Sequence, residues 1–148
     1  MNEDKEQVVI VPCSGIGKPF GSVAREAGYE LCEELRPDST RLVALSKLVL
    51  GDEEARERVR QCPVITIDGC KLMCAAKLAR HSGGTVAREV TVFEAFRQHK
   101  ELKPEGIAEL NALGKQLARV MAEEIAEVVD DLVRKASGGE ALSGGNHA

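Results

Sequence analysis

The sequence contains no tryptophan, a single tyrosine and three phenylalanines, so aromatic residues make up only 3% of its 148 residues. Proteins that bind single-stranded nucleic acid usually stack the bases on several aromatic rings, and this chain has few to offer. An excess of basic residues is missing as well, because the formal net charge is −4 and the pI is near 5.5. We therefore expect a protein that binds neither nucleic acid nor anionic membranes.

The sequence also has no apolar run that approaches the length of a transmembrane helix. Its start, Met-Asn-Glu-Asp-Lys-Glu-Gln, is too acidic for a signal peptide. We therefore expect a cytoplasmic protein. It carries five cysteines, and an odd number of thiols in a reducing compartment favours metal binding or thiol chemistry over a disulfide framework.

Short β-branched runs alternate with helical patterns along the chain. We expect strands at Gln7–Val11, Leu42–Leu45, Pro63–Asp68 and Thr85–Val92, and helices at about Ser22–Leu35, Asp52–Gln61 and Lys71–Ser82. This alternation predicts an α/β fold in three layers, with a mostly parallel four-stranded sheet flanked by helices.

A long C-terminal helix is predicted from Pro104 to about Lys135, either unbroken or divided near Gly114. Its apolar residues favour packing on the core first and a homodimer surface second. By length, residues 1–136 form one domain. The tail, residues 137–148, is rich in glycine and serine and is expected to be disordered.

The segment Val64–Cys74 is the junction between the third strand and the helix after it. Asp68-Gly69 ends the strand, and Cys70 and Cys74 follow. If the helix begins near Cys70, the i,i+4 spacing places both sulfurs on one side of its first turn. Unpaired backbone N–H groups and the helix dipole there favour negative charge, so we expect both thiols to ionise readily.

Three of the five cysteines are predicted to meet at one edge of the sheet. Cys13 follows the first strand and Cys70 the third, and parallel strands end at the same edge. Cys62 precedes the third strand, roughly 20 Å or more from Cys70. The secondary thiol Cys32 lies about 15 Å down the first helix. We therefore expect Cys13, Cys70 and Cys74 to form one site, with Cys32 and Cys62 at the opposite edge.

Zinc is the metal that such thiolates fit. A structural zinc site has four ligands, whereas an open site has three and leaves one position for water or substrate. Three cysteines without a nearby histidine fit the open arrangement, since His81 lies about 10 Å along the helix from Cys74. The candidates for the fourth position are water, Asp68, or Cys62 if the strand register differs from our prediction.

The alternative is thiol chemistry without a resident metal, either redox or the carriage of sulfur or selenium. Lys77 shares a helix face with Cys74, and its ammonium group would favour a thiolate. The simpler interpretation is that Lys77 is a solvated lysine on the helix surface with no role at the thiol. The pair is also spaced C-x-x-x-C, which is less tied to disulfide exchange than C-x-x-C. This function therefore ranks second, and neither function names a reaction or a substrate.

The loop after the first strand is rich in glycine, and its site residues are Ser14, Gly15 and Gly17. A phosphatase loop of the low-molecular-weight type needs arginine six positions after its cysteine, where this chain has Pro19. A dinucleotide loop has a different glycine spacing and needs an acidic residue after the second strand, which is absent. We interpret the loop as a tight turn beside the thiols that can present N–H groups to a small anion.

These residues resemble the DGC-domain family of proteins, which is named for its Asp-Gly-Cys and is predicted to bind zinc. The resemblance rests on Val11-Pro-Cys13-Ser-Gly15, Ile67-Asp-Gly-Cys70 and Cys74-Ala-Ala-Lys77, and runs from about Val8 to Gly84. It implies a prokaryotic cytoplasmic protein in which Cys13, Cys70 and Cys74 are metal ligands. Many members have a further cysteine at the end of the second strand, where this chain has Ala44.

Overall fold

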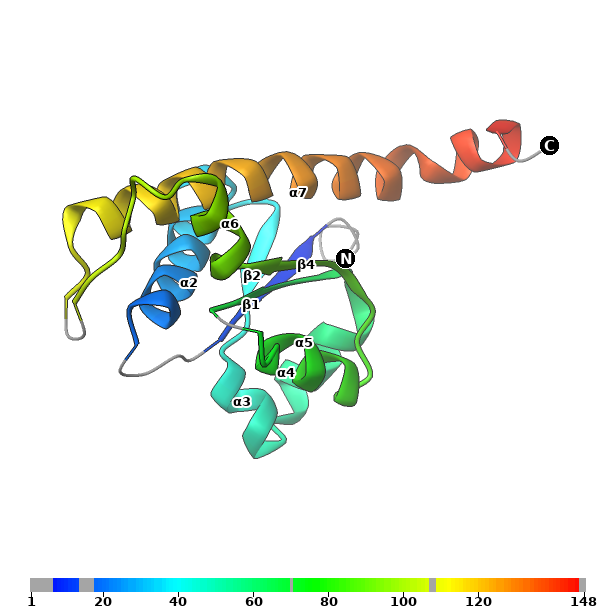
Figure 1. Ribbon diagram of the computed structural model, residues 1–148. Helices are drawn as coiled ribbons and strands as arrows, with labels where there is room; N and C mark the ends of the chain where they lie inside the picture. Colours follow the sequence, from blue (N-terminus) through cyan, green and yellow to red (C-terminus); the bar gives the residue numbers. More distant parts are fainter. Residues whose placement is uncertain (1–6, 14–17, 70, 107–108, 147–148) are drawn as a thin grey trace.

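The computed structural model describes residues 7–13, 18–69, 71–106 and 109–146, and gives only the backbone of residues 137–146. Four parallel strands form one sheet in the order β2-β1-β3-β4 (Figure 1). The strands are β1 (Val8–Pro12), β2 (Thr40–Leu42), β3 (Val64–Asp68) and β4 (Val86–Thr91). The predicted four-stranded parallel sheet is therefore confirmed.

Helices cover both faces of this sheet, as the α/β prediction requires (Figure 1). One face carries α2 (Pro19–Tyr29), the π-helix η1 (Glu30–Leu35), α6 (Val92–Gln98) and α7 (Ala112–Asn146). The other face carries α3 (Leu45–Leu50), α4 (Glu53–Gln61) and α5 (Cys74–His81). In the described part of the chain, each helix is too short or too polar to serve as a membrane span.

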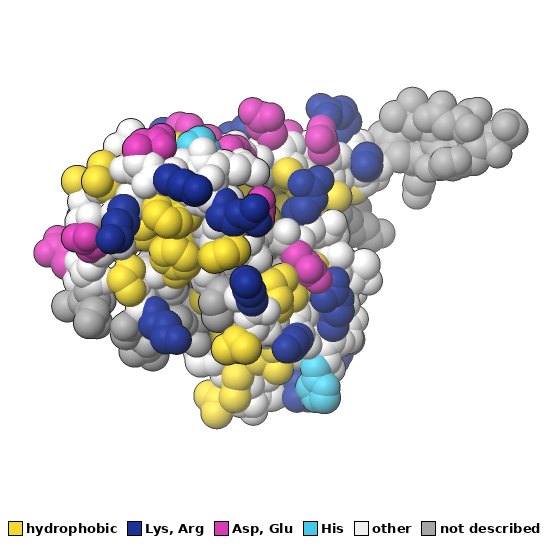
Figure 2. Space-filling model, viewed as in Figure 1, with side chains coloured by type: hydrophobic (Ala, Val, Ile, Leu, Met, Phe, Trp, Pro, Cys, Tyr) yellow, Lys and Arg dark blue, Asp and Glu magenta, His cyan; other side chains and the backbone are white. Residues whose placement is uncertain are grey.

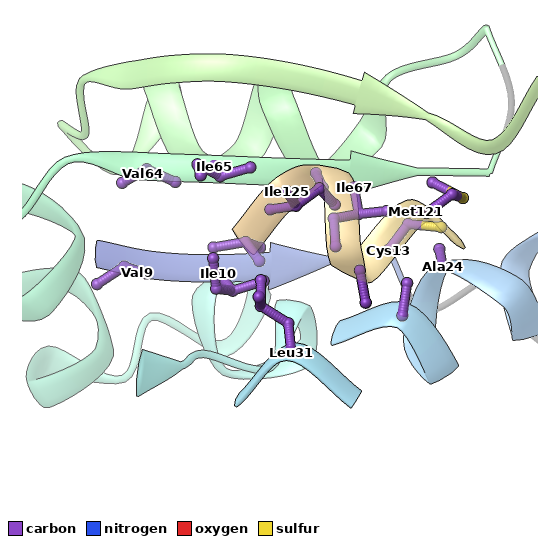
Figure 3. Close-up of a cluster of buried hydrophobic side chains, with 14 of the residues drawn as sticks. Val9, Ile10, Cys13, Ala24, Leu31, Val64, Ile65, Ile67, Met121 and Ile125 are labelled. Carbon is purple, nitrogen blue, oxygen red and sulfur yellow. The ribbon is translucent and has the colours of Figure 1, made fainter. Parts of the chain in front are cut away.

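The core lies between the central strands and the helices. Every residue of β1 and β3 is buried, as expected for apolar strands covered on both faces. Figure 3 shows side chains of these strands meeting Ala24 of α2, Leu31 of η1, and Met121 and Ile125 of α7. Cys13 belongs to the same buried cluster, so the first thiol of the chain is part of the core.

Several predicted element boundaries are wrong. The first helix begins at Pro19, a proline suited to a first helical position, and becomes a π-helix at Glu30. The second strand ends at Leu42, because Ala44 is already the N-cap of α3. Helix α6 was not predicted; it follows β4 directly, and the Thr91 hydroxyl caps it by accepting from the Glu94 N–H at 3.1 Å.

The long C-terminal helix begins at Ala112, eight residues later than predicted, and is unbroken. Gly114 lies in its first turn, where its N–H donates to the side chain of Asn111 at 2.9 Å. Residues that were expected to pack on the core, among them Leu117, Met121, Ile125 and Val129, are buried in this chain's own domain. The helical backbone continues through residues 137–146, the segment expected to be disordered, and projects beyond the rest of the molecule (Figure 1).

Candidate functional site

Two adjacent strand ends bring Cys13 and the Asp68-Gly69 turn together. In the parallel register Pro12 lies beside Ile67, and the Cys13 N–H donates to the Ile67 carbonyl at 2.8 Å. The next contact involves the thiol itself, because the Gly69 N–H donates to Cys13 Sγ at 3.2 Å. A backbone N–H directed at sulfur stabilises negative charge on it, as it would for a metal-bound or reactive thiolate.

Gly69 is held in place by the first turn of α2. A Cβ atom at this position would lie 3.1 Å from the Gly21 nitrogen and 3.1 Å from the Phe20 carbonyl carbon. These neighbours are backbone atoms, so they cannot move aside as the end of a flexible side chain could. The glycine therefore allows β3 to approach α2 closely enough for its N–H to reach the Cys13 sulfur.

Asp68 caps the helix that carries Cys74. Its side chain is only 1% exposed, and its two carboxylate oxygens accept from the N–H groups of Ala75 at 2.7 Å and Ala76 at 3.2 Å. Burial raises the pKa of Asp68 above its usual value, and the two backbone hydrogen bonds oppose that shift. Both oxygens of Asp68 therefore hold the N-terminus of the helix that begins at Cys74.

Cys74 is the first residue of α5 and is exposed to solvent. The prediction that the helix begins near Cys70 is wrong, because α5 begins at Cys74. Cys70 itself lies outside the described residues. The residue before Cys74 explains the late start. Met73 adopts the left-handed conformation at φ 57°, the one positive φ among the described non-glycine residues, and a helix cannot run through it.

Lys77 lies in the first turn of α5 and is exposed. Its backbone N–H donates to the Met73 carbonyl at 2.9 Å. Its charge lowers the pKa of Asp68, which partly offsets the effect of burial on that carboxyl group. The lysine thus contributes positive charge at the predicted edge, next to the helix terminus that carries Cys74.

Cys32 and Cys62 lie at the opposite edge of the sheet, as predicted. Cys62 is buried at the end of α4, two residues before β3, and the length of that strand separates it from Asp68 by roughly 20 Å. Cys62 therefore lies far from the strand ends that carry Cys13 and Asp68. Cys32 lies in η1, where burial raises the pKa of its thiol to about 11 against an opposing hydrogen bond with Thr40.

The described residues hold no group of three histidine, cysteine, aspartate or glutamate side chains close enough to bind a metal. Cys70 and the loop residues Ser14, Gly15 and Gly17 lie outside the described residues, so the predicted set of three thiols is described only at Cys13 and Cys74. His81 is the last residue of α5, at the other end of the helix from Cys74, as expected. What the structure does bring together is Cys13, Gly69 and the capped start of the Cys74 helix.

Aromatic residues also gather at this edge, which was not predicted from the sequence. Thr91, the last residue of β4, pairs with Asp68, so α6 starts beside the Asp-Gly turn. The ring of Phe96 in α6 lies 5.6 Å from that of Phe20 in α2, edge to face. The Lys71 ammonium lies 5.1 Å from the ring centroid of Phe93. Recognising α6 as a helix would have pointed to these contacts.

A hollow of about 350 Å³ lies beside Ala44, at the edge of the sheet formed by β2. Its lining includes charged residues of both signs, namely Arg41, Lys47, Arg58, Asp52 and Glu54. A second hollow, of about 360 Å³, lies between β4, α6 and α7. Neither hollow is lined by any of the four cysteines that the structure describes, namely Cys13, Cys32, Cys62 and Cys74.

Comparison with known proteins identifies the family of the chain. The family model of the DGC domain matches residues 9–132, which include β1 from Val9 onward, the other three strands, and α7 as far as Leu132. No curated protein and no solved structure matches the chain. Because the match spans most of the sequence and both halves of the cysteine pattern, the chain belongs to the DGC domain family.

Proposed function

We propose that this protein binds zinc through the thiolates of Cys13, Cys70 and Cys74 at the carboxyl edge of the sheet. The observation that carries the proposal is the Gly69 N–H···Sγ hydrogen bond to Cys13, which joins the ends of β1 and β3 at a sulfur atom. Cys70 follows Gly69 in the sequence, and Cys74 begins the helix that Asp68 caps. Thiolates and the fourfold coordination of zinc suit such a cluster.

The site proposed here is open. Of the candidates for a fourth ligand, Cys62 is at the far edge and Asp68 is occupied with the α5 N-terminus. Ala44, after β2, offers no donor side chain. The fourth position would then belong to water or a small ligand, and bound zinc would act there as a Lewis acid.

Zinc content of serine variants tests which thiols act together. Substituting Cys13, Cys70 or Cys74 by serine should each remove most of the bound metal, because the three ligands share one ion. The matched controls Cys32→Ser and Cys62→Ser should retain it. Elemental analysis of anaerobically purified proteins measures this, and equal zinc loss from Cys62→Ser and Cys70→Ser would contradict the proposal.

Cobalt replacement tests whether the site is open. With one exchangeable position, imidazole or a small thiol should bind the cobalt ion and change its visible spectrum. A closed site of four protein ligands would show no change on adding either compound. That result would indicate that the metal has a structural role and that the function of the protein depends on other residues.

A thiol carrier or redox protein is the second candidate, and the exposure of Cys74 favours it. This thiol lies at the first position of α5, one turn from Lys77, where an exchange partner could reach it. This function requires little metal in the purified protein and rapid alkylation of Cys74 by iodoacetamide below pH 8. Zinc at one equivalent per chain, with alkylation only after chelation, would exclude it.

We also propose a cytoplasmic location, since a reducing compartment keeps thiols available for either chemistry. Fractionation of cells that express the chain should recover it with the cytoplasmic proteins. Recovery from an oxidising compartment with its cysteines paired would contradict this location.

A further inference from the structure

All three phenylalanines of the chain lie at the carboxyl edge of the sheet. Phe20 is in the first turn of α2, and Phe93 and Phe96 are in α6, which begins where β4 ends. The three belong to the surroundings of the cysteine site, since the backbone of Phe20 contacts Gly69 and the ring of Phe20 packs on Phe96. In a chain with only four aromatic residues, this gathering concentrates apolar area next to the thiols.

Two cations lie beside one of these rings, that of Phe93. Lys71 Nζ lies 5.1 Å and Arg97 Cζ 6.0 Å from the ring centroid of Phe93. Both side chains are exposed, and so are those of Lys18 at the start of α2 and Lys77 in α5. Glu94 is an exposed carboxylate next to these cations, and it pairs with Arg97 at 3.4 Å. Although the whole chain has a net charge of −4, the exposed charges named here are mostly positive.

An exposed leucine completes the surface. Leu72 follows Lys71 and precedes the Cys74 helix, and its side chain is 63% exposed. Figure 2 shows hydrophobic surface bordered by Lys and Arg side chains in the region where Figure 1 places α6. An exposed apolar residue beside several cations suits a ligand that combines apolar groups with negative charge.

We propose that this surface, defined by Lys71, Leu72, Phe93 and Arg97, binds an acidic segment of a partner protein that carries apolar side chains next to Asp or Glu. Carboxylates of the segment would pair with Lys71 and Arg97, and an apolar side chain would cover Leu72 and Phe93. The proposal rests on the proposed function, because the bound partner would lie against Cys74 and so would be the protein that exchanges zinc or a thiol-bound group with this site.

Single-stranded nucleic acid also combines negative charge with apolar rings, but the contacts here favour a protein. The Phe93 ring already has two cations next to it, and Phe20 and Phe96 pack edge to face on each other. Stacking of a base requires an open ring face. Leu72 is instead an exposed aliphatic side chain, which can cover an apolar side chain of a protein segment but offers no ring face on which a base could stack.

Peptide selection tests the proposal directly. A phage library of random 12-residue peptides is selected on the immobilised full-length protein, and the enriched sequences are synthesised with a fluorescent label. We expect enrichment of Asp or Glu beside Leu, Ile or Phe. Affinities measured by fluorescence anisotropy should fall at least tenfold for Lys71→Glu and for Leu72→Asp, and should weaken with added salt.

Matched control variants are available elsewhere on the surface. Lys135→Glu changes an exposed lysine of α7, and Leu50→Asp an exposed leucine of α3 on the opposite face of the sheet from α6. Both should bind the selected peptides as the wild type does. The proposal is overturned if the enriched peptides have no acidic bias, if Lys71→Glu binds them unchanged, or if a labelled oligothymidine binds more tightly and displaces them.

Zinc content and thiol alkylation of the wild-type protein are measured in parallel. Peptide binding without metal or reactive thiols would support the docking surface and overturn the proposed function. Metal and reactive thiols without selective peptide binding would support the proposed function and overturn the docking surface. The two proposals can therefore fail separately.

Discussion

The two edges of the sheet place cysteines in opposite environments. At the amino edge, Cys32 is largely enclosed and its pKa is raised to about 11, while Cys62 is buried at the end of α4. At the carboxyl edge, Cys13 accepts a hydrogen bond from the Gly69 N–H and Cys74 begins a helix in solvent. Parallel topology causes this difference, since N-termini of helices and the turns after strands collect at the carboxyl edge. Cys74 is therefore exposed to solvent at one edge, whereas Cys62 is buried at the other.

Alkylation rates provide the largest expected contrast between the edges. At pH 8, in protein freed of metal by a chelator, Cys74 should react with iodoacetamide about 100-fold faster than Cys32. A pKa about 2 units above the ordinary value reduces the thiolate fraction of Cys32 by that factor, and burial slows it further. Peptide mapping by mass spectrometry measures both sites in one sample. The two alkylation rates should converge in 8 M urea. Rates within threefold of each other in the folded protein would contradict the predicted difference between the two edges.

The free energy of unfolding at alkaline pH provides a second test of the environment of Cys32. Between pH 9 and 11 the unfolded chain loses the Cys32 proton while the folded state keeps it, because the pKa is about 11 when folded and 9.0 otherwise. The free energy of unfolding should therefore decrease as the pH rises through this window, by roughly 2 kcal/mol in total. Urea unfolding of Cys32→Ala should show a shallower decrease than wild type. Parallel curves for the two proteins would contradict the raised pKa.

Two glycines allow a matched comparison of the edges. Gly69→Ala, at the carboxyl edge, places a Cβ 3.1 Å from backbone atoms of α2, and Gly84→Ala, before β4, places one 2.3 Å from the buried Val59 side chain. Each should lower the free energy of unfolding by about 1–3 kcal/mol. Only Gly69→Ala should also reduce zinc content, because it moves the N–H that binds Cys13. Equal zinc loss in the two variants would mean that destabilisation alone releases the metal.

Truncation after Lys135 should have the smallest effect. The helical backbone of the removed part of α7 projects beyond the domain, so its loss should leave the described core intact (Figure 1). We expect a melting temperature within about 2 °C of the full chain and unchanged zinc content. Calorimetry and elemental analysis measure these. A large drop in melting temperature would show that the end of α7 packs against another surface, such as a second copy of the chain.

The sequence by itself determined the parallel sheet and the separation of the thiols into two groups. Buried β-branched runs such as Val8–Val11 specify strands, and alternation with helices makes those strands parallel. Once the strands are parallel, Cys13 and the Asp68-Gly69 turn must meet at one edge, and Cys62 must lie at the other. The hydrogen bond between Gly69 and Cys13 follows that prediction closely.

Only the tertiary structure decided where the helix of Cys74 begins and what surrounds it. Asp68 caps α5 from the preceding strand, and Met73 takes a left-handed conformation that amino-acid preferences disfavour, so local patterns could not locate the start. The cluster of Phe20, Phe93 and Phe96 depends on α2 and α6 meeting over the strand ends. Contacts between segments far apart in the chain leave no periodic pattern in the sequence. The raised pKa of Cys32 likewise depends on the tertiary structure, because it arises from burial that packing creates.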